Sequence, residues 1–159
     1  NAGRTRSFGA EAQLALTDWH GFTFRASYGF TNARFRRFFD GRQDYRGKVV
    51  PYAPRNTVFL QTVYLLKTPR CSFLDDIAFD VNMRGTGKIY WNEANSLHQP
   101  FYALLGASAT FTRGDCSIQI WGENLTDTRY KTFYFVSIGN EFVQRGLPLR
   151  WGVTLRLNF

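Results

Sequence analysis

The side chains best suited to bind a charged ligand are basic and fall within one short stretch of the chain. They are Arg34, Arg36, Arg37, Arg42, Arg46 and Lys48. Guanidinium groups bind phosphate and carboxylate groups through charge-assisted hydrogen bonds, often in bidentate pairs. The cluster therefore predicts a binding site for an anion, although an ordinary solvated loop would also carry such charges.

The remaining reactive side chains form no recognisable catalytic or metal-binding pattern. The two histidines are His20 and His98, and the two cysteines are Cys71 and Cys116. No spacing of His, Cys or carboxylate residues matches a zinc site, and no nucleophile stands with a base and an acid in a known order. We expect no enzyme activity, no metal and no cofactor. The cysteines could pair in an oxidising compartment or stay as free thiols.

The overall charge would suit nucleic acid, but the motifs do not support that partner. The net charge is +8 at pH 7, and basic proteins attract polyanions. Apart from the one cluster, however, the arginines are scattered. The chain contains no RNP pattern, no zinc-finger spacing and no basic helix. We therefore do not expect a nucleic-acid-binding protein.

Extended strands must position the charged groups, because apolar and polar residues alternate along most of the chain. The last nine residues show this most clearly, with one apolar side formed by Trp151, Val153, Leu155, Leu157 and Phe159. Successive side chains of a strand point to opposite faces. One face is thus apolar up to the last residue, whereas chain ends usually fray in water. The pattern is typical of a strand with lipid on one side and water on the other.

The same alternation recurs and predicts about seven antiparallel strands in a meander. The expected strands are about 8–17, 22–31, 55–66, 77–84, 105–112, 118–135 and 148–159. Short connections at 18–21, 67–75 and 113–116 alternate with long ones at 37–52, 87–100 and 136–147. Outer-membrane barrels have short periplasmic turns and long outer loops. The strand at 55–66 is apolar on both sides, so the alternation does not assign its lipid face.

These patterns favour an all-β, up-and-down transmembrane barrel segment. A closed antiparallel barrel in a bacterial single chain normally has an even number of strands, so seven strands indicate a piece of a larger barrel. The alternative is a soluble β-sandwich with an aromatic core, since aromatic residues make up 18% of the chain. No stretch of 18 apolar residues suggests a helical membrane span, and the first residues show no signal peptide.

Several stretches resemble motifs of TonB-dependent outer-membrane receptors. Residues 124–130 are similar to the NLFDxxY element of that family, with Thr126 in place of the common Phe. Residues 146–149 resemble the GRPR element before the last strand, with Leu147 and Leu149 in place of the usual arginines. Further resemblances lie at 9–12, 26–33, 50–56 and 101–106.

The resemblance implies that residues 1–159 are the C-terminal third of a 22-stranded barrel with a plugged lumen, without the plug domain itself. The full protein would import a scarce nutrient, such as a ferric siderophore, haem, cobalamin or a glycan. It would lie in the outer membrane of a Gram-negative bacterium and receive energy from TonB through the plug. The alternatives are a passive porin-type channel and a soluble β-sandwich binding module.

The resemblance also implies roles for particular residues. The lumen-facing and plug-facing set would be Glu11, Arg25, Asp80, Arg84, Gln119 and Arg156. The strand from Trp151 to Phe159 would be the signal read by the barrel-assembly machinery. The arginine cluster would hold an anionic substrate or the phosphates of lipopolysaccharide. Other partners would be outer-membrane lipid and the N-terminal remainder of the barrel. Substrate could contact Tyr90, Trp91, His98, Tyr134 and Phe135, although aromatic residues near strand ends more often form the interfacial girdle.

Overall fold

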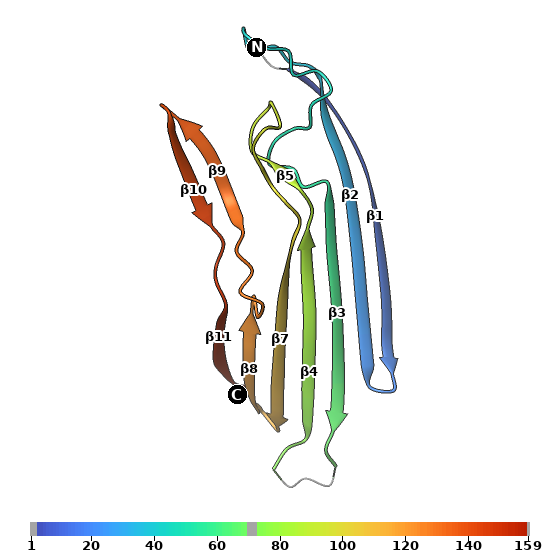
Figure 1. Cartoon of the computed structure of the whole chain (residues 1–159). Coiled ribbons are helices and arrows are strands. Elements are labelled where there is room, and N and C mark those ends of the chain that lie inside the picture. Colours follow the sequence, from blue (N-terminus) through green and yellow to red (C-terminus); the bar gives the residue numbers. More distant parts are fainter. Residues whose placement is uncertain (1–2, 70–72, 159) are drawn as a thin grey trace.

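A computed structural model describes residues 3–69 and 73–158 of the chain. The main feature is one antiparallel sheet of seven strands (Figure 1). In order across the sheet they are β1 (Arg4–Trp19), β2 (Phe22–Arg37), β3 (Asn56–Lys67), β4 (Asp76–Thr86), β7 (Tyr102–Arg113), β8 (Cys116–Glu123) and β11 (Arg150–Leu157). Two small hairpins pair β5 (Ile89–Tyr90) with β6 (His98–Gln99), and β9 (Lys131–Ser137) with β10 (Asn140–Arg145). No helix within the described ranges is long and apolar enough to cross a membrane.

The seven-stranded meander and its unequal connections confirm the prediction. Three short connections lie at one end of the sheet and three long ones at the other (Figure 1). The shortest turns contain Gly21 and Gly114, whose φ angles are +83° and +51°. Glycine adopts such left-handed conformations without a steric penalty, which allows the chain to reverse sharply.

Three strand boundaries differ from the prediction by four residues or more. The first strand begins at Arg4 and the second ends at Arg37, so both extend beyond their clearest apolar alternation. The sixth strand ends at Glu123 instead of continuing to about Phe135. The reason is local, because Asn124 has a φ of +49° and its side chain binds nearby backbone groups in place of a neighbouring strand.

The two faces of the sheet differ in chemistry, as the pairing register shows. One row of directly opposed residues contains Leu14, Ala26, Leu60, Met83 and Leu105. We call the side of the sheet that carries this row the apolar face. In the adjacent row of β2, β3 and β4, the register aligns Arg25, Gln61 and Asn82 on the opposite side. We call that side the polar face.

The register also assigns the faces of β3, which alternation alone did not. Leu60 is paired with Ala26 on one neighbour and with Met83 on the other, so it belongs to the apolar face. Val58 and Tyr64 share that face, whereas Gln61 lies on the polar one. The strand is ambiguous in sequence because the polar face also carries apolar side chains.

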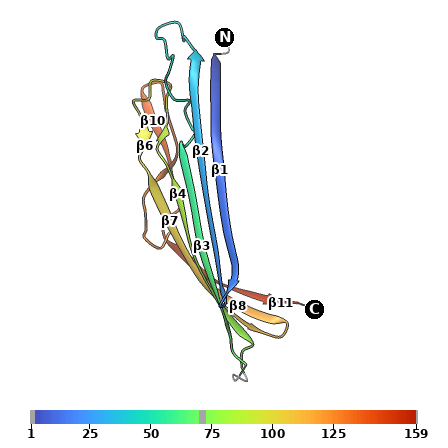
Figure 2. The same ribbon diagram turned by 90° about the vertical axis from the view of Figure 1, so that its right-hand side faces the viewer.

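The apolar face is bare. In β11 the exposed fractions of Trp151 and Leu155 are 74% and 61%. Figure 2 shows the sheet as a single curved layer rather than two packed ones. The buried apolar side chains among the described residues are Ile89, Trp91 and Tyr134, and none of them belongs to the seven-stranded sheet. A soluble sandwich would need its aromatic core at the sheet, so this architecture is not the one observed.

Aromatic rings gather at two heights on the apolar face. Near the turns, the ring of Phe22 lies 4.5 Å from that of Tyr64 and 5.7 Å from that of Phe24. Near the long loops, Phe30 contacts Phe8 at 6.1 Å between ring centroids. Phe22 and Phe30 are separated by roughly 26 Å along the strand, at about 3.3 Å per residue. Two aromatic girdles with an apolar band between them are typical of membrane barrels.

Candidate functional site

A chain of polar side chains crosses three strands on the polar face. The Arg25 guanidinium donates to Gln61 Oε1 at 3.0 Å, and the Gln61 amide donates to the Asp80 carboxylate. Asn82 Nδ2 donates to Asp80 Oδ1 at 2.7 Å. These groups satisfy one another laterally, because cross-strand neighbours are close enough for direct contact. The polar face is therefore an organised hydrogen-bonding surface.

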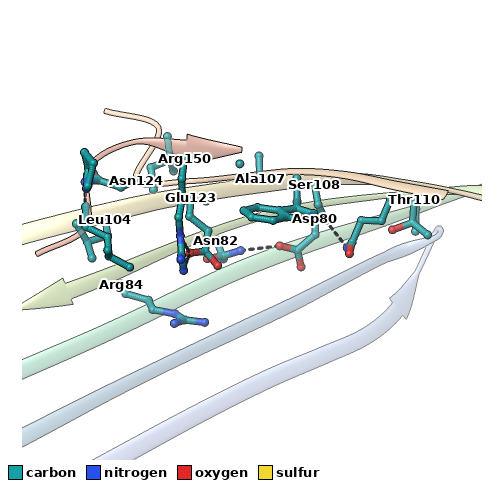
Figure 3. Close-up of a pocket in the computed structure, with 18 of the residues that line it drawn as sticks. Asp80, Asn82, Arg84, Leu104, Ala107, Ser108, Thr110, Glu123, Asn124 and Arg150 are labelled. Atoms are coloured by element: carbon teal, nitrogen blue, oxygen red, sulfur yellow. Dashed lines mark hydrogen bonds and ion pairs between the residues drawn. The ribbon is translucent and has the colours of Figure 1, made fainter. Parts of the chain in front are cut away.

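Next to this chain, the polar face forms a hollow of about 700 Å³ over β4, β7 and β8. Asp80, Arg84, Ser108 and Gln119 line it. Figure 3 shows Asp80, Arg84 and Ser108 in this hollow. Gln119 Nε2 donates to Ser108 Oγ at 3.2 Å. Carboxylate, guanidinium, amide and hydroxyl groups together suit water and polar protein groups rather than lipid.

The structure places all six predicted lumen-facing residues on the polar face. Their registers align Glu11 with Gly29 in the first two strands, and Arg156 with Ser117 in the last two. Asp80, Arg84 and Gln119 line the hollow, whereas Glu11 and Arg156 belong to the outermost strands. The six residues thus share one face and are separated along it, and the role of that face as the lining of a lumen stays a prediction.

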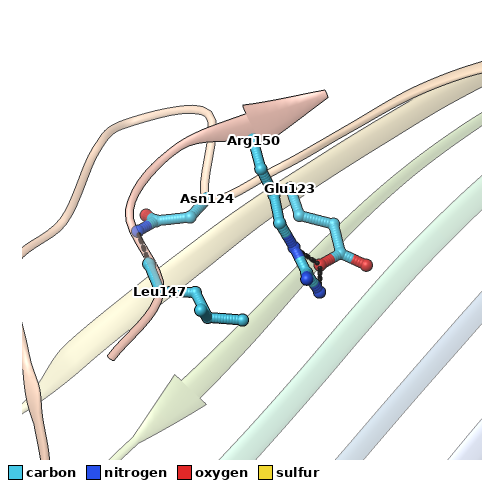
Figure 4. Close-up of polar contacts among 4 residues, drawn as sticks. All are labelled: Glu123, Asn124, Leu147 and Arg150. Carbon is cyan, nitrogen blue, oxygen red and sulfur yellow. Dashed lines mark hydrogen bonds and ion pairs between the residues drawn. The ribbon is translucent and has the colours of Figure 1, made fainter. Parts of the chain in front are cut away.

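An ion pair at the loop end of the polar face was not predicted. Arg150 lies opposite Glu123, and its Nε donates to Glu123 Oε2 at 2.8 Å (Figure 4). Both side chains are about half exposed, so the pair is expected to contribute no more than about 1 kcal/mol. The position of Arg150, next to the GRPR-like element, was the one hint of this pair in the sequence. Glu123 was not recognised as its partner because the sixth strand was expected to continue past it to about 135.

Asn124 connects the end of β8 to the segment that precedes β11. This side chain is buried, with 5% exposed, and its Nδ2 donates to the carbonyls of Thr128 and Leu147, each at 3.0 Å (Figure 4). Its Oδ1 accepts the backbone N–H of Thr128 at 2.9 Å. Asp127 contributes a second link, since its Oδ1 accepts the N–H of Leu149 at 3.1 Å. The NLFDxxY-like element therefore has a structural role here.

The same junction explains Gly146. A Cβ atom added at this glycine would lie 2.0 Å from Cζ of Tyr130. The Tyr130 ring stacks on Tyr102 with 4.6 Å between centroids, so it cannot simply move aside. Any larger residue at position 146 would displace the tyrosine from β7.

The three long loops contact one another above the sheet and form a unit that we call the loop cluster, covering 38–55, 87–101 and 124–149. Tyr52 connects all three, because its N–H donates to the Tyr90 carbonyl at 2.9 Å and its hydroxyl donates to the Tyr134 carbonyl at 3.0 Å. Asn95 adds a link, since its amide both accepts from Val49 N, at 2.8 Å, and donates to Val49 O, at 2.9 Å.

Packing inside the loop cluster removes two of the expected substrate contacts from the surface. Trp91 is 5% exposed and Tyr134 is 4% exposed, and both pack with Ile89. Burial and a hydrogen bond with Glu141 raise the pKa of the Tyr134 hydroxyl above its usual value. These aromatic residues hold the loops together, whereas Phe135 remains accessible.

The structure divides the arginine cluster. Arg34 lies on the same side of β2 as Phe30. Beyond Arg34 a register shift interrupts the simple alternation, and Arg37 is paired with Arg4. Arg34, Arg36 and Arg46 line a hollow of about 620 Å³ together with Arg6. Arg6 escaped prediction because it is far from the cluster in sequence, although it is paired directly with Arg34.

The predicted assembly strand is largely within the described residues. Trp151, Val153, Leu155 and Leu157 share the exposed apolar face, as expected from their alternation. Phe159 and Cys71 lie outside the described residues.

Comparisons with known proteins give the same architecture. A family model described as TonB dependent receptor-like, beta-barrel, matches residues 1–125. The ferric yersiniabactin uptake receptor FyuA from Yersinia pestis is similar with a TM-score of 0.86 and 21% identity over 100% of this chain and 24% of that one. The ferric citrate transporter FecA is similar with a TM-score of 0.81 and 22% identity over 99% of this chain and 25% of that one.

The siderophore receptor PiuA from Acinetobacter baumannii gives a TM-score of 0.77 and 17% identity over 99% of this chain and 22% of that one. The chain thus spans about a quarter of the length of these solved structures. Because these identities are between 17% and 22%, the similarity shows a shared fold only.

Proposed function

The chain belongs to the TonB-dependent receptor β-barrel family, and from this premise we propose that it is part of the barrel of an outer-membrane receptor that imports a ferric siderophore. The family consists of receptors and transporters rather than enzymes. A ferric chelate is the preferred substrate class, because FyuA is named as a ferric yersiniabactin uptake receptor, PiuA as a siderophore receptor and FecA as a ferric citrate transporter.

The observation that carries the proposal is the contrast between the two faces of one sheet. Leu155 and its neighbours leave an apolar face bare, which is stable only against lipid or another apolar surface. Arg25, Gln61 and Asp80 form a connected polar surface on the other side. A barrel wall in a membrane meets both requirements, with lipid outside and a hydrated lumen inside.

The two unpaired edges of the sheet indicate that further strands pair with it. β1 and β11 each have a strand on one side only, and unpaired backbone groups are costly in lipid. We infer that the remaining strands of the receptor pair with both edges and that the plug domain contacts the polar face. TonB would act through that plug. The barrel-assembly machinery would recognise the last strand, from Trp151 to Phe159.

Uptake of iron by cells tests the proposal. The full-length receptor, with its plug, is expressed in a Gram-negative strain that lacks its own siderophore receptors, and uptake of ⁵⁵Fe-loaded siderophores is measured with and without TonB. We expect uptake of at least one ferric siderophore that is lost when TonB is deleted. Uptake that persists without TonB would indicate a passive channel instead. Failure with every ferric siderophore, alongside TonB-dependent uptake of haem or cobalamin, would reject the substrate class.

A further inference from the structure

The hairpin formed by β9 and β10 continues the pair formed by β8 and β11. The chain passes from β8 to β9 through residues 124–130, and from β10 to β11 through residues 146–149. These two connections are joined by a hydrogen bond of 2.9 Å from the Gly146 N–H to the Tyr130 carbonyl. β9 therefore lies above β8, and β10 lies above β11 at the side of the molecule where the main sheet ends (Figure 1).

The outer edge of β10 is unprotected. Within the residues that the structure describes, β10 has a neighbouring strand on one side only, and all its residues are exposed. The charges of Glu141 and Arg145 and the register shift before Arg145 lie towards its two ends, whereas Phe142, Val143 and Gln144 form an uncharged middle. Proteins protect such an edge with charges, prolines or bulges, or cover it with another segment. A two-stranded hairpin is also only marginally stable by itself, so a third strand suits this edge.

Both sides of the hairpin offer apolar contacts to a third strand. On one side the rings of Phe135 and Phe142 stack with 4.8 Å between their centroids. On the other side Val143 is paired with Tyr134, which is buried in the loop cluster. Aromatic and β-branched side chains stabilise neighbouring strands through cross-strand contacts. The edge therefore fits an extended polypeptide segment that carries apolar side chains on both of its sides.

The position of β10 above β11 indicates which segment this is. The unpaired edge of β11 is where a further strand of the receptor is proposed to pair. Strands of an up-and-down barrel are antiparallel, so that strand would rise past β10 when it continues outwards. β2 shows that strands of this sheet reach that far. It continues from Phe30, in the aromatic girdle near the long loops, to Arg37, which adds roughly 23 Å at about 3.3 Å per residue.

We infer that the strand that pairs with β11 continues beyond the membrane and pairs with β10 as the third strand of the small sheet. The partner is thus the outer end of that strand, in the part of the receptor that precedes residues 1–159. The inference rests on the proposed function, because it needs a further strand beside β11. It adds a second attachment for the loop cluster. Tyr134 in β9 packs with Trp91 and Ile89, so a strand on β10 connects all three long loops to the opposite side of the barrel seam.

Site-specific photo-cross-linking of the full-length receptor in the outer membrane tests this pairing. p-Benzoylphenylalanine is introduced in place of Val143, and the cross-linked peptides are identified by mass spectrometry. The matched control carries the label in place of Val136, which lies on the same side of the hairpin but in β9. The two valines are 42% and 53% exposed, so accessibility alone favours the control. A third protein carries the label in place of Val153 in β11 and identifies the strand that pairs there. Heat-modifiable migration on gels verifies that each barrel is folded.

We expect the label at Val143 to capture a segment about ten residues C-terminal to the one captured from Val153, because antiparallel neighbours run in opposite directions. The yield should be at least fivefold higher than from Val136. Equal yields at these two positions, capture of a second copy of the receptor, or capture of lipid alone would overturn the inference. A captured segment N-terminal to the one found from Val153 would also overturn it. If the label at Val143 unfolds the hairpin, a label at Gln144 must capture the same segment.

The label in β11 separates this inference from the proposed function. Capture of a barrel strand from Val153 without capture from Val143 leaves the proposed barrel intact and rejects the pairing of β10. Failure to capture any barrel strand from either position rejects the closure of the barrel at β11, on which both proposals depend. Siderophore uptake is measured on the unlabelled receptor, so the substrate class is tested independently of the seam.

Discussion

The seven-stranded sheet, which we call the wall, and the loop cluster above it differ in where their apolar side chains lie. The wall buries none of its apolar side chains within the described part of the chain and exposes Trp151 and Leu155. The loop cluster buries Trp91 and Tyr134 and joins three loops through Tyr52. The apolar side chains of the wall thus need a partner outside the described residues to cover them, whereas the loops form a small core of their own.

This difference separates two kinds of stability. Burial of apolar side chains in the loop cluster stabilises it in water. In the proposed barrel, the wall would gain its stability from lipid on its apolar face and from the hydrogen bonds between its strands. Substitutions should therefore affect one region without the other, and the four predictions below test that separation from the largest expected effect to the smallest.

Trp91→Ala should disrupt the loop cluster alone. Removing a buried indole costs about 3–5 kcal/mol, because the cavity it leaves collapses only in part. The Trp91 ring lies 5.5 Å from that of Tyr52, so the connection between the loops would loosen. Hydrogen exchange of the intact receptor should show faster exchange at 87–101 and 131–145. Faster exchange in β2 to β4 as well would contradict the separation.

Leu155→Arg should disrupt the wall alone. An arginine on the lipid face costs up to roughly 4 kcal/mol, and the cost falls from the bilayer midplane towards the interfaces. It is measured by reversible folding of the full receptor into lipid vesicles. Thr154→Arg is the control on the polar face. It loses the 3.1 Å hydrogen bond from Trp121 Nε1, which costs about 1 kcal/mol. Equal costs at the two positions would reject the assignment of the faces.

Asn124→Ala should weaken the junction between the two regions. The change removes three hydrogen bonds and leaves the Leu147 carbonyl without its partner, at a cost of about 1–3 kcal/mol. Asn124→Gly is the informative comparison, because glycine accepts the positive φ but lacks the amide. Protease nicking between 124 and 149 should rise in both variants. If the glycine variant resists nicking like the wild type, backbone conformation rather than hydrogen bonding holds the junction.

The tip of the first loop, far from the buried core, should respond least. The Asp40 carboxylate accepts the N–H groups of Arg42 and Gln43, each at 2.8 Å, and the Tyr45 hydroxyl at 2.7 Å. The backbone bond from Gln43, followed by the bond from Tyr45, lowers the pKa of Asp40, and the Asp40 bond raises the pKa of Tyr45 above 10.0.

A depressed carboxyl pKa stabilises the turn above the ordinary value of 3.8 and ceases to do so as the pH falls through the lowered one. Asp40→Asn should remove this acid sensitivity and return the pKa of Tyr45 towards its usual value. An NMR titration of ¹³C-labelled tyrosine, assigned with Tyr45→Phe, measures the shift. An unchanged pKa of Tyr45 would mean that the hydrogen bond to Asp40 is absent in solution.

The sequence alone predicted those features of the molecule that depend on local pattern. The exposed face from Trp151 to Leu157 follows from strict alternation, and the common face of Arg25 and Asp80 follows from the same rule. The positions of the reverse turns followed from glycines such as Gly114. Local periodicity is enough for these features because a strand has a fixed two-residue repeat.

Features that depend on pairing between distant residues could not be predicted in this way. Arg6 joins Arg34 only through the register of two strands, and the register also decides the faces of β3. The hydrogen bond from Asn124 to the distant Leu147 carbonyl could not be read from the pattern either. The end of β8 itself had a local sign, because the polar run from Thr126 to Arg129 interrupts the alternation that was expected to continue to about Phe135.

The side-chain amide of Asn95 makes hydrogen bonds that the backbone of a neighbouring strand would normally make. Its amide offers one acceptor and one donor to the same residue, Val49, as an adjacent strand would. A carboxylate at this position could accept but not donate, and a hydroxyl could not span both groups. A single amide thus joins the two loops through the same pair of hydrogen bonds that a strand residue would supply. Loops joined in this manner can change length and composition elsewhere while their mutual attachment persists.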